Sequence, residues 1–227
     1  MSTRKKIIFV IVEGPSDSDS LGVILTRMFD KNQVYVHVAH GDITTDFGTT
    51  TQNVLTKIAA MVQNYRSMYR LQTSDFLQVV HLIDTDGAFI PDSAIIEDSA
   101  CETLFYSETE IHGSDRAAIR KRNQQKRSII RRLYSCGKVC KTIPYRAYYM
   151  SSNLDHVLHN LQNASNKEKE KNALSFAIRY RNDIEEFKRF ISESDFSITG
   201  DYQKSWEYIQ QDLHSLERHT NLGIWFQ

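Results

Sequence analysis

The chain has 227 residues, which is long enough for one sizeable α/β domain or for a catalytic core with a helical appendage. An apolar content of 41%, with only 3 prolines and 9 glycines, argues against a disordered, collagen-like or low-complexity protein. The 28 basic and 28 acidic residues cancel, so net charge alone makes no case for nucleic acid as a partner.

The composition also bears on the compartment. No stretch approaches the ~20 consecutive apolar residues of a membrane span. The apolar run at residues 7–12 is too short for the core of a secretion signal. The 3 cysteines lack the regular spacing of a disulfide framework or a zinc site. We therefore expect a soluble, cytoplasmic protein that does not associate with membranes.

The first half of the chain alternates predicted strands and helices. Residues 7–12 (IIFVIV) are typical of a central parallel strand that is covered on both faces. Asp17 or Ser18 can cap a helix that runs to about residue 29. Residues 34–38 and 76–83 predict two more strands, and residues 49–69 predict the helix between them. This β-α-β-α-β order predicts a parallel sheet with right-handed crossover connections.

Acidic residues follow two of these strands at the point where each strand ends. Glu13 comes directly after the first strand, and Asp84 and Asp86 come directly after the third. Ligands of such sheets bind beyond the carboxyl ends of the strands, so we expect the three carboxylates to converge. Mg²⁺ or Mn²⁺ would relieve their repulsion, because hard cations prefer oxygen ligands. For Asp17 taken alone, a helix cap is the favoured interpretation.

Charge is strongly segregated in the middle of the chain. Residues 92–115 contain seven acids and no base, and residues 116–141 contain ten bases and no acid. We expect weak structure in the acidic stretch and a helix over residues 116–134. The basic stretch could bind phosphates, or it could be a solvated surface that the acids balance. In a third hypothesis the acids mask the bases, and neutralising Glu97, Asp98 and Glu102 would raise affinity for nucleic acid.

The second half predicts strands at residues 139–143 and 145–150 and a short helix at 154–161, capped by Ser152 or Asn153. Residues 174–191 and 202–219 have the spacing of two amphipathic helices. We therefore expect a catalytic core over residues 1–160, with the charged insertion at about 90–141. A helical C-terminal cover would follow over residues 161–227.

The run Ile-Val-Glu-Gly-Pro-Ser-Asp at residues 11–17, with Ile-Asp-Thr-Asp-Gly at 83–87, resembles the Toprim family. That family includes topoisomerases, bacterial primases, small ribonucleases, recombination proteins and OLD-type nucleases, and the small defence-locus nucleases are the most similar. The resemblance covers residues 5–90 well and extends weakly to about 160. It implies an α/β fold with a Toprim-like parallel sheet flanked by helices, followed by a helical C-terminal extension.

The resemblance also implies roles for individual residues. Glu13 would donate or accept a proton or assist metal binding, and Asp84 and Asp86 would hold the divalent ion. Asp17 matches a position where some relatives carry a second-metal ligand. Asp155 matches an acidic residue in a late strand-to-helix element, although the residue after Asn153 departs from the pattern, which often has proline there. In the alternative interpretation, Asp155 is an ordinary acid in the first turn of a helix, where the helix dipole favours it.

These roles imply a divalent-metal-dependent nuclease that hydrolyses phosphodiester bonds in RNA or DNA. By analogy with such relatives, the chain would be the effector of an anti-phage, abortive-infection system, and it would act together with an ATPase. No Walker-type phosphate-binding motif occurs in the chain, so the ATPase would be a separate protein. Two alternatives remain open: a non-catalytic Toprim module that binds nucleic acid or partners, and a primase-like nucleotidyl transferase. Homo-oligomers are compatible with any of the three.

Overall fold

The computed structural model describes residues 5–41, 43–46 and 48–227. They form two compact units, each assembled from three separate segments of the chain. The first unit comprises the described residues of Met1–Leu82, together with Ile129–Tyr148 and Glu170–Ile184. The second unit comprises Ile83–Ser128, Tyr149–Lys169 and Glu185–Gln227. The division at residue 160 that the sequence suggested stays a prediction.

A five-stranded sheet forms the centre of the first unit. Its strands, in the order β2-β1-β3-β8-β7, are β2 (Val34–His40), β1 (Lys6–Val12), β3 (Phe76–Asp84), β8 (Ile143–Met150) and β7 (Lys138–Val139). Strand β1 pairs in parallel with both β2 and β3, which confirms the β-α-β-α-β prediction for these strands.

The prediction of an entirely parallel sheet is wrong at the β7 edge. Strands β7 and β8 pair antiparallel, so the sheet is mixed, with mostly parallel strands. The connection between them is a tight turn in which Cys140 and Lys141 have φ values of 48° and 71°. A parallel pair needs a crossover of a dozen or more residues, which so short a connection cannot provide.

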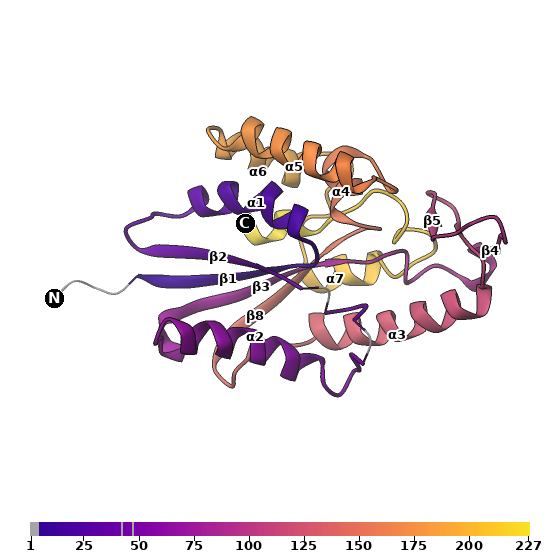
Figure 1. The fold of residues 1–227 in the computed structure, drawn as a ribbon. Coiled ribbons are helices and arrows are strands. Elements are labelled where there is room, and N and C mark those ends of the chain that lie inside the picture. The colour runs from indigo at the N-terminus through magenta and orange to yellow at the C-terminus, as the bar shows by residue number, and fades with distance from the viewer. Residues whose placement is uncertain (1–4, 42, 47) are drawn as a thin grey trace. The chain divides into compact units, whose positions relative to one another are not determined.

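Helices cover both faces of this sheet. Helix α1 (Pro15–Met28) lies on one face and α2 (Val54–Met68) on the other (Figure 1). The six residues of β1 from Ile7 to Val12 are all buried, as expected for a central strand. Helix α1 contributes Leu21, Ile24 and Leu25 to the core, and α2 contributes Val54, Ile58 and Val62. The first unit is therefore a helix–sheet–helix sandwich.

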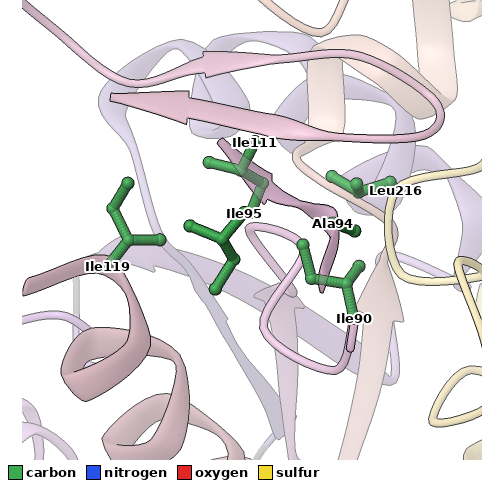
Figure 2. Packing of buried hydrophobic residues seen from close by; sticks show 6 residues of the cluster. All are labelled: Ile90, Ala94, Ile95, Ile111, Ile119 and Leu216. Atoms are coloured by element: carbon green, nitrogen blue, oxygen red, sulfur yellow. The ribbon is translucent and has the colours of Figure 1, made fainter. Parts of the chain in front are cut away.

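The second unit contains a small sheet within the acidic stretch. Strands β4 (Ile95–Glu97), β6 (Ile111–Gly113) and β5 (Phe105–Tyr106) lie in the order β4-β6-β5. Figure 2 shows Ile95 and Ile111 gathered with Ile119 of helix α3 (Arg116–Tyr134) and with Leu216 in one buried cluster. The expectation of weak structure here is wrong, because these few apolar residues suffice to anchor the stretch.

The C-terminal region is helical but more broken than the sequence predicts. Its elements are α4 (Leu154–His159), α5 (Asn166–Tyr180), α6 (Ile184–Glu193), α7 (Tyr202–Tyr208) and the 3₁₀ segment η3 (Leu222–Phe226). Two shorter 3₁₀ segments, η1 (Thr73–Asp75) and η2 (Asp92–Ala94), lie earlier in the chain. Across the described residues, no helix is long and apolar enough to span a bilayer.

Two predicted helix lengths are wrong. The predicted helix at 174–191 is two helices, with a break near Asn182, whose side-chain oxygen accepts a hydrogen bond from Arg27 at 2.9 Å. The helix expected to reach residue 219 ends at Tyr208. There the carbonyl of Tyr208 accepts the amide of Gln211 at 3.1 Å and also lies 2.7 Å from Nδ1 of His214, so the chain leaves the α-helical hydrogen-bond pattern.

Candidate metal-binding and catalytic site

Asp84 ends β3 and Asp86 lies in the turn that follows, whose backbone is tightly fixed. The buried Thr85 donates its amide to the carbonyl of Met150 at 2.9 Å and its hydroxyl to the carbonyl of Ser215 at 2.9 Å. The amide of Asp86 donates to the carbonyl of Ser152 at 2.8 Å. Two distant segments of the second unit therefore hold the two carboxylates in place.

Asp86 and Gly87 adopt the left-handed backbone conformation, with φ values of 47° and 62°. A Cβ atom at Gly87 would lie 2.5 Å from a methyl carbon of Leu216, so only glycine fits there. Aspartate tolerates this conformation better than most residues but still bears some strain. Strained residues of this kind concentrate at functional sites, which makes the turn a candidate on structural grounds as well.

Lys126 of α3 forms an ion pair with the Asp86 carboxylate. Only 1% of the lysine side chain is exposed, against 22% of the aspartate. Arg122 lies one turn earlier on the same face of α3. It donates to the backbone carbonyl of Asp86 at 2.8 Å and to the hydroxyl of Tyr106 at 2.6 Å. A buried ammonium thus neutralises Asp86, and a guanidinium fixes the backbone that bears it.

Glu13 and Asp17 lie in the first unit. Glu13 is half-buried and accepts a hydrogen bond from the hydroxyl of the buried Thr44 at 2.6 Å. Asp17 is buried in the first turn of α1, at its third residue, and accepts the amide of Gly14 at 2.8 Å. Gly14, rather than Asp17 or Ser18, precedes the helix as its N-cap residue.

The backbone of Gly14 is extended, with φ −116° and ψ 161°, a conformation open to any residue. What limits this position is space, because a Cβ atom would lie 3.2 Å from Oδ2 of Asp17. Glycine here serves the close approach of the capping carboxylate.

The donor chemistry of the four predicted residues suits a hard divalent cation, since all are carboxylates. Asp84 and Asp86 belong to the second unit, and Glu13 and Asp17 to the first. Within the ranges that the structure describes, no three His, Cys, Asp or Glu side chains form a group able to hold a metal ion. Convergence of the four carboxylates on one cation therefore stays a prediction.

The late strand-to-helix element places Asp155 and His156 in the interior of the second unit. Asn153 caps α4 by accepting the amide of His156 at 2.9 Å, as predicted. Burial raises the pKa of Asp155, and Lys169 lies 3.7 Å from its carboxylate. Burial also lowers the pKa of His156 to about 4, which keeps its ring neutral at physiological pH.

In the part of the chain that the structure describes, Arg116 and Arg120 of the basic stretch contact residues of the acidic stretch. Nε of Arg120 lies 3.1 Å from Asp92, and the amide of Arg116 lies 3.4 Å from Glu97. Asp98 instead accepts the amide of Ala100 and the thiol of Cys101 within its own turn. The masking hypothesis therefore acquires a different principal acid, Asp92, which the sequence did not single out.

Lys126 and Arg122 are the polar neighbours of the predicted site that sequence reasoning missed. A signal for Lys126 exists in the helical spacing, because Ile119, Asn123 and Lys126 all fall at buried positions of α3. A lysine on the buried face of a helix requires a charged partner. The partner itself cannot be identified from spacing, since Asp86 lies 40 positions away.

Comparison of the chain with models of known protein families, with curated proteins and with solved structures yields no match.

Proposed function

We propose that the chain is a Toprim-like, divalent-metal-dependent nuclease that hydrolyses phosphodiester bonds in RNA or DNA. The observation that carries this proposal is the parallel pairing of β1 with β3, in which Ile11 lies opposite His81. Glu13 follows the first of these strands directly, Asp84 is the last residue of the second, and Asp86 lies two residues beyond it. Acids at the carboxyl ends of adjacent parallel strands occupy the usual ligand-binding edge of an α/β sheet.

In the proposed site Asp84 and Asp86 would hold Mg²⁺ or Mn²⁺, with Glu13 and Asp17 as further candidate ligands. The bound cation would supply positive charge against the negative charge that develops on the phosphoryl oxygens. Glu13 would accept a proton from the attacking water, and the hydroxyl of Thr44 orients its carboxylate through the 2.6 Å hydrogen bond. Lys126 would balance the charge of Asp86 when no divalent cation is bound.

The biological setting is proposed from the resemblance of the sequence motifs alone. The chain would act in the cytoplasm as the toxic effector of an anti-phage system, with a separate ATPase as its partner. RNA and DNA both carry the phosphate backbone that the proposed site would cleave. The exposed bases of α3, among them Lys121 and Arg132, would contact the phosphate backbone of either.

A cleavage assay tests the proposal. The purified chain is incubated with Mg²⁺ or Mn²⁺ and with labelled single- and double-stranded RNA and DNA, and is compared with Glu13→Gln, Asp84→Asn and Asp86→Asn. We expect the unmodified chain to cleave, and a chelator to abolish this cleavage. Each of the three substitutions should reduce the cleavage rate at least a hundredfold. The control Glu102→Gln, at an exposed position, should cleave at the unmodified rate.

Two other outcomes would each replace the proposal with one of its alternatives. Product strands that lengthen only when nucleoside triphosphates are added would identify a nucleotidyl transferase. Tight binding of nucleic acid without turnover, unchanged in Glu13→Gln, would identify a non-catalytic module.

A further inference from the structure

The second unit contains a pocket of about 280 Å³ outside the acidic turn. All three chain segments of the unit contribute to its lining, which consists of Glu108, Asn160, Asp195, Phe196, Arg218 and His219. The volume is close to the lower end of the range for small-molecule sites and suits a single planar ring system. None of these residues has a role in the proposed hydrolysis.

Arg218 and Phe196 form a flat floor for this pocket. The guanidinium carbon of Arg218 lies 4.1 Å from the centroid of the Phe196 ring, which is only 3% exposed. Nε and Nη2 of Arg218 both donate to the carbonyl of Val157, at 3.0 and 2.7 Å, and these bonds fix the plane of the guanidinium. One guanidinium face is therefore covered by the phenyl ring. Arg218 also lines the pocket, where a planar ligand would stack against its guanidinium.

The rim carries hydrogen-bond acceptors. Glu108 and Asp195 are exposed carboxylates, and Asn160, held in the left-handed conformation at the end of α4, adds an amide. Asp195 is adjacent in sequence to the floor residue Phe196, and its charge opposes the lowering of the Arg218 pKa by burial. Asp195 therefore lies close enough to Arg218 to interact with its charge.

The charges of the pocket favour an uncharged nucleobase over a phosphate as its ligand. Two carboxylates face one guanidinium, and burial lowers the pKa of His219, so this imidazole adds little positive charge near neutral pH. A phosphate would meet a net negative rim. A ligand that stacks on the floor and donates hydrogen bonds from its edge would satisfy both the guanidinium face and the carboxylates.

We propose that this pocket binds a guanine base, which stacks on Arg218 and donates its N1–H and N2–H groups to the carboxylate of Asp195. Guanine is the one common base that presents two parallel donors on one edge, and a carboxylate accepts such a pair through both of its oxygens. Glu108 and Asn160 would contact the remaining polar edge.

The pocket is connected to the acidic turn through the backbone of the second unit. The carbonyl of Ser215 accepts the hydroxyl of Thr85, and the carbonyl of His219 accepts the amide of Ser151 at 2.9 Å. Residues 215–219 therefore link the Asp84–Asp86 turn to the floor of the pocket. As a substrate-recognition site, the pocket rests on the proposed nuclease function, and it would give cleavage a preference for guanine-containing strands.

Nucleoside binding to the full chain, measured by NMR with chelator present, tests the pocket without any need for cleavage. The Nε–H signal of Arg218, identified by its loss in Arg218→Lys, reports on the floor. We expect guanosine to shift this signal saturably and inosine, which lacks the N2 amino group, to bind about tenfold more weakly. Asp195→Asn should weaken guanosine at least tenfold, whereas Glu207→Gln, an exposed acid elsewhere in the unit, should not.

The results separate this proposal from the nuclease proposal. Guanosine binding in a chain that cleaves nothing keeps the pocket and removes its role in substrate recognition. Cleavage without a shift of the Arg218 signal overturns the guanine pocket and leaves the nuclease intact. The guanine proposal is also overturned if adenosine or uridine binds as tightly as guanosine. Stronger binding of free arginine would overturn it as well and would indicate a basic peptide as the ligand.

Discussion

The ammonium group of Lys126 pairs with the carboxylate of Asp86, and the lysine side chain is almost wholly buried. Asp86 is at once one of the predicted metal ligands and a residue in the left-handed backbone conformation. A cation provided by the protein therefore already occupies one side of this carboxylate. We therefore expect the ion pair of Lys126 with Asp86 to affect the binding of a divalent cation at Asp86, and the cation to affect the pair.

Replacing Lys126 by methionine should lower the free energy of unfolding by about 3–5 kcal/mol in the presence of chelator. The substitution leaves the Asp86 carboxylate without its buried counter-charge, and breaking such a pair has a cost of this size. Thermal or urea unfolding measures the loss. Lys121→Met, an exposed change on the same helix, should stay within about 0.5 kcal/mol of the unmodified chain.

Added Mg²⁺ should restore part of that loss, because a metal at Asp86 would supply the missing positive charge. We expect the increase in melting temperature on addition of Mg²⁺ to be larger in Lys126→Met than in the unmodified chain. An equal increase in both proteins would show that Asp86 does not bind the metal.

Acid should destabilise the fold through His156. Burial lowers the pKa of this ring from 6.5 to about 4, so the unfolded chain binds a proton that the folded chain rejects. The stabilising contribution is complete above pH 6.5 and is lost as the pH falls toward 4, a change of about 3 kcal/mol. His159 and His219, whose pKa values burial also lowers, act in the same direction.

Melting temperatures measured from pH 7.5 to pH 4.5 test this expectation. His156→Phe keeps a buried ring but cannot take up a proton, so its stability should depend less steeply on pH. His40→Gln, at an exposed position, serves as the control for removing a histidine. A His156→Phe slope equal to that of the unmodified chain would assign the acid sensitivity to other groups.

Thr44→Val should reduce the turnover of the proposed nuclease by about ten- to a hundredfold, the range expected when a hydrogen bond to a charged group is lost. Thr44 is a positioning residue, since it acts through Glu13. The acidic limb of the pH–rate profile should move to higher pH, because the carboxylate loses a donor that favours its ionised form. Thr44→Ser should restore both rate and profile, and a lower rate with an unshifted profile would contradict the assigned role.

Asp92→Asn should raise the affinity for nucleic acid about two- to fivefold at low salt, because it frees Arg120 from its carboxylate partner 3.1 Å away. The gain should disappear at high salt, where surface charges are screened. Fluorescence anisotropy with a labelled oligonucleotide measures both. Asp98→Asn removes an equal charge from a side chain that binds only its own turn, and we expect it to have little effect.

The sequence predicted the central strands because their pattern is local. Residues 7–12 are apolar on both faces, and such a run is stable only when both sides are covered, as β1 is. The predicted limits of α3, residues 116–134, also agree with the structure, since its start is marked by Asp115, which accepts the amide of Ala118.

Elements whose ends depend on distant groups were predicted less well. The break between α5 and α6 lies where Arg27 binds Asn182, and the end of α7 lies where His214 meets the Tyr208 carbonyl. Neither contact leaves a trace in hydrophobic periodicity. The fold of the acidic stretch depends in the same way on Ile119 and Leu216, which lie outside it.

Residue type and local spacing alone predict the strand–helix alternation, the acids at the ends of β1 and β3, and the segregation of charge. The ion pair of Lys126 with Asp86, the hydrogen bond of Thr44 to Glu13, and the stacking of Arg218 on Phe196 arise instead from contacts that the fold creates between distant residues. Those pairings join residues that are 22 to 40 positions apart. They form because burial leaves a charged or polar group with few partners, and no spacing rule specifies which partner lies within reach.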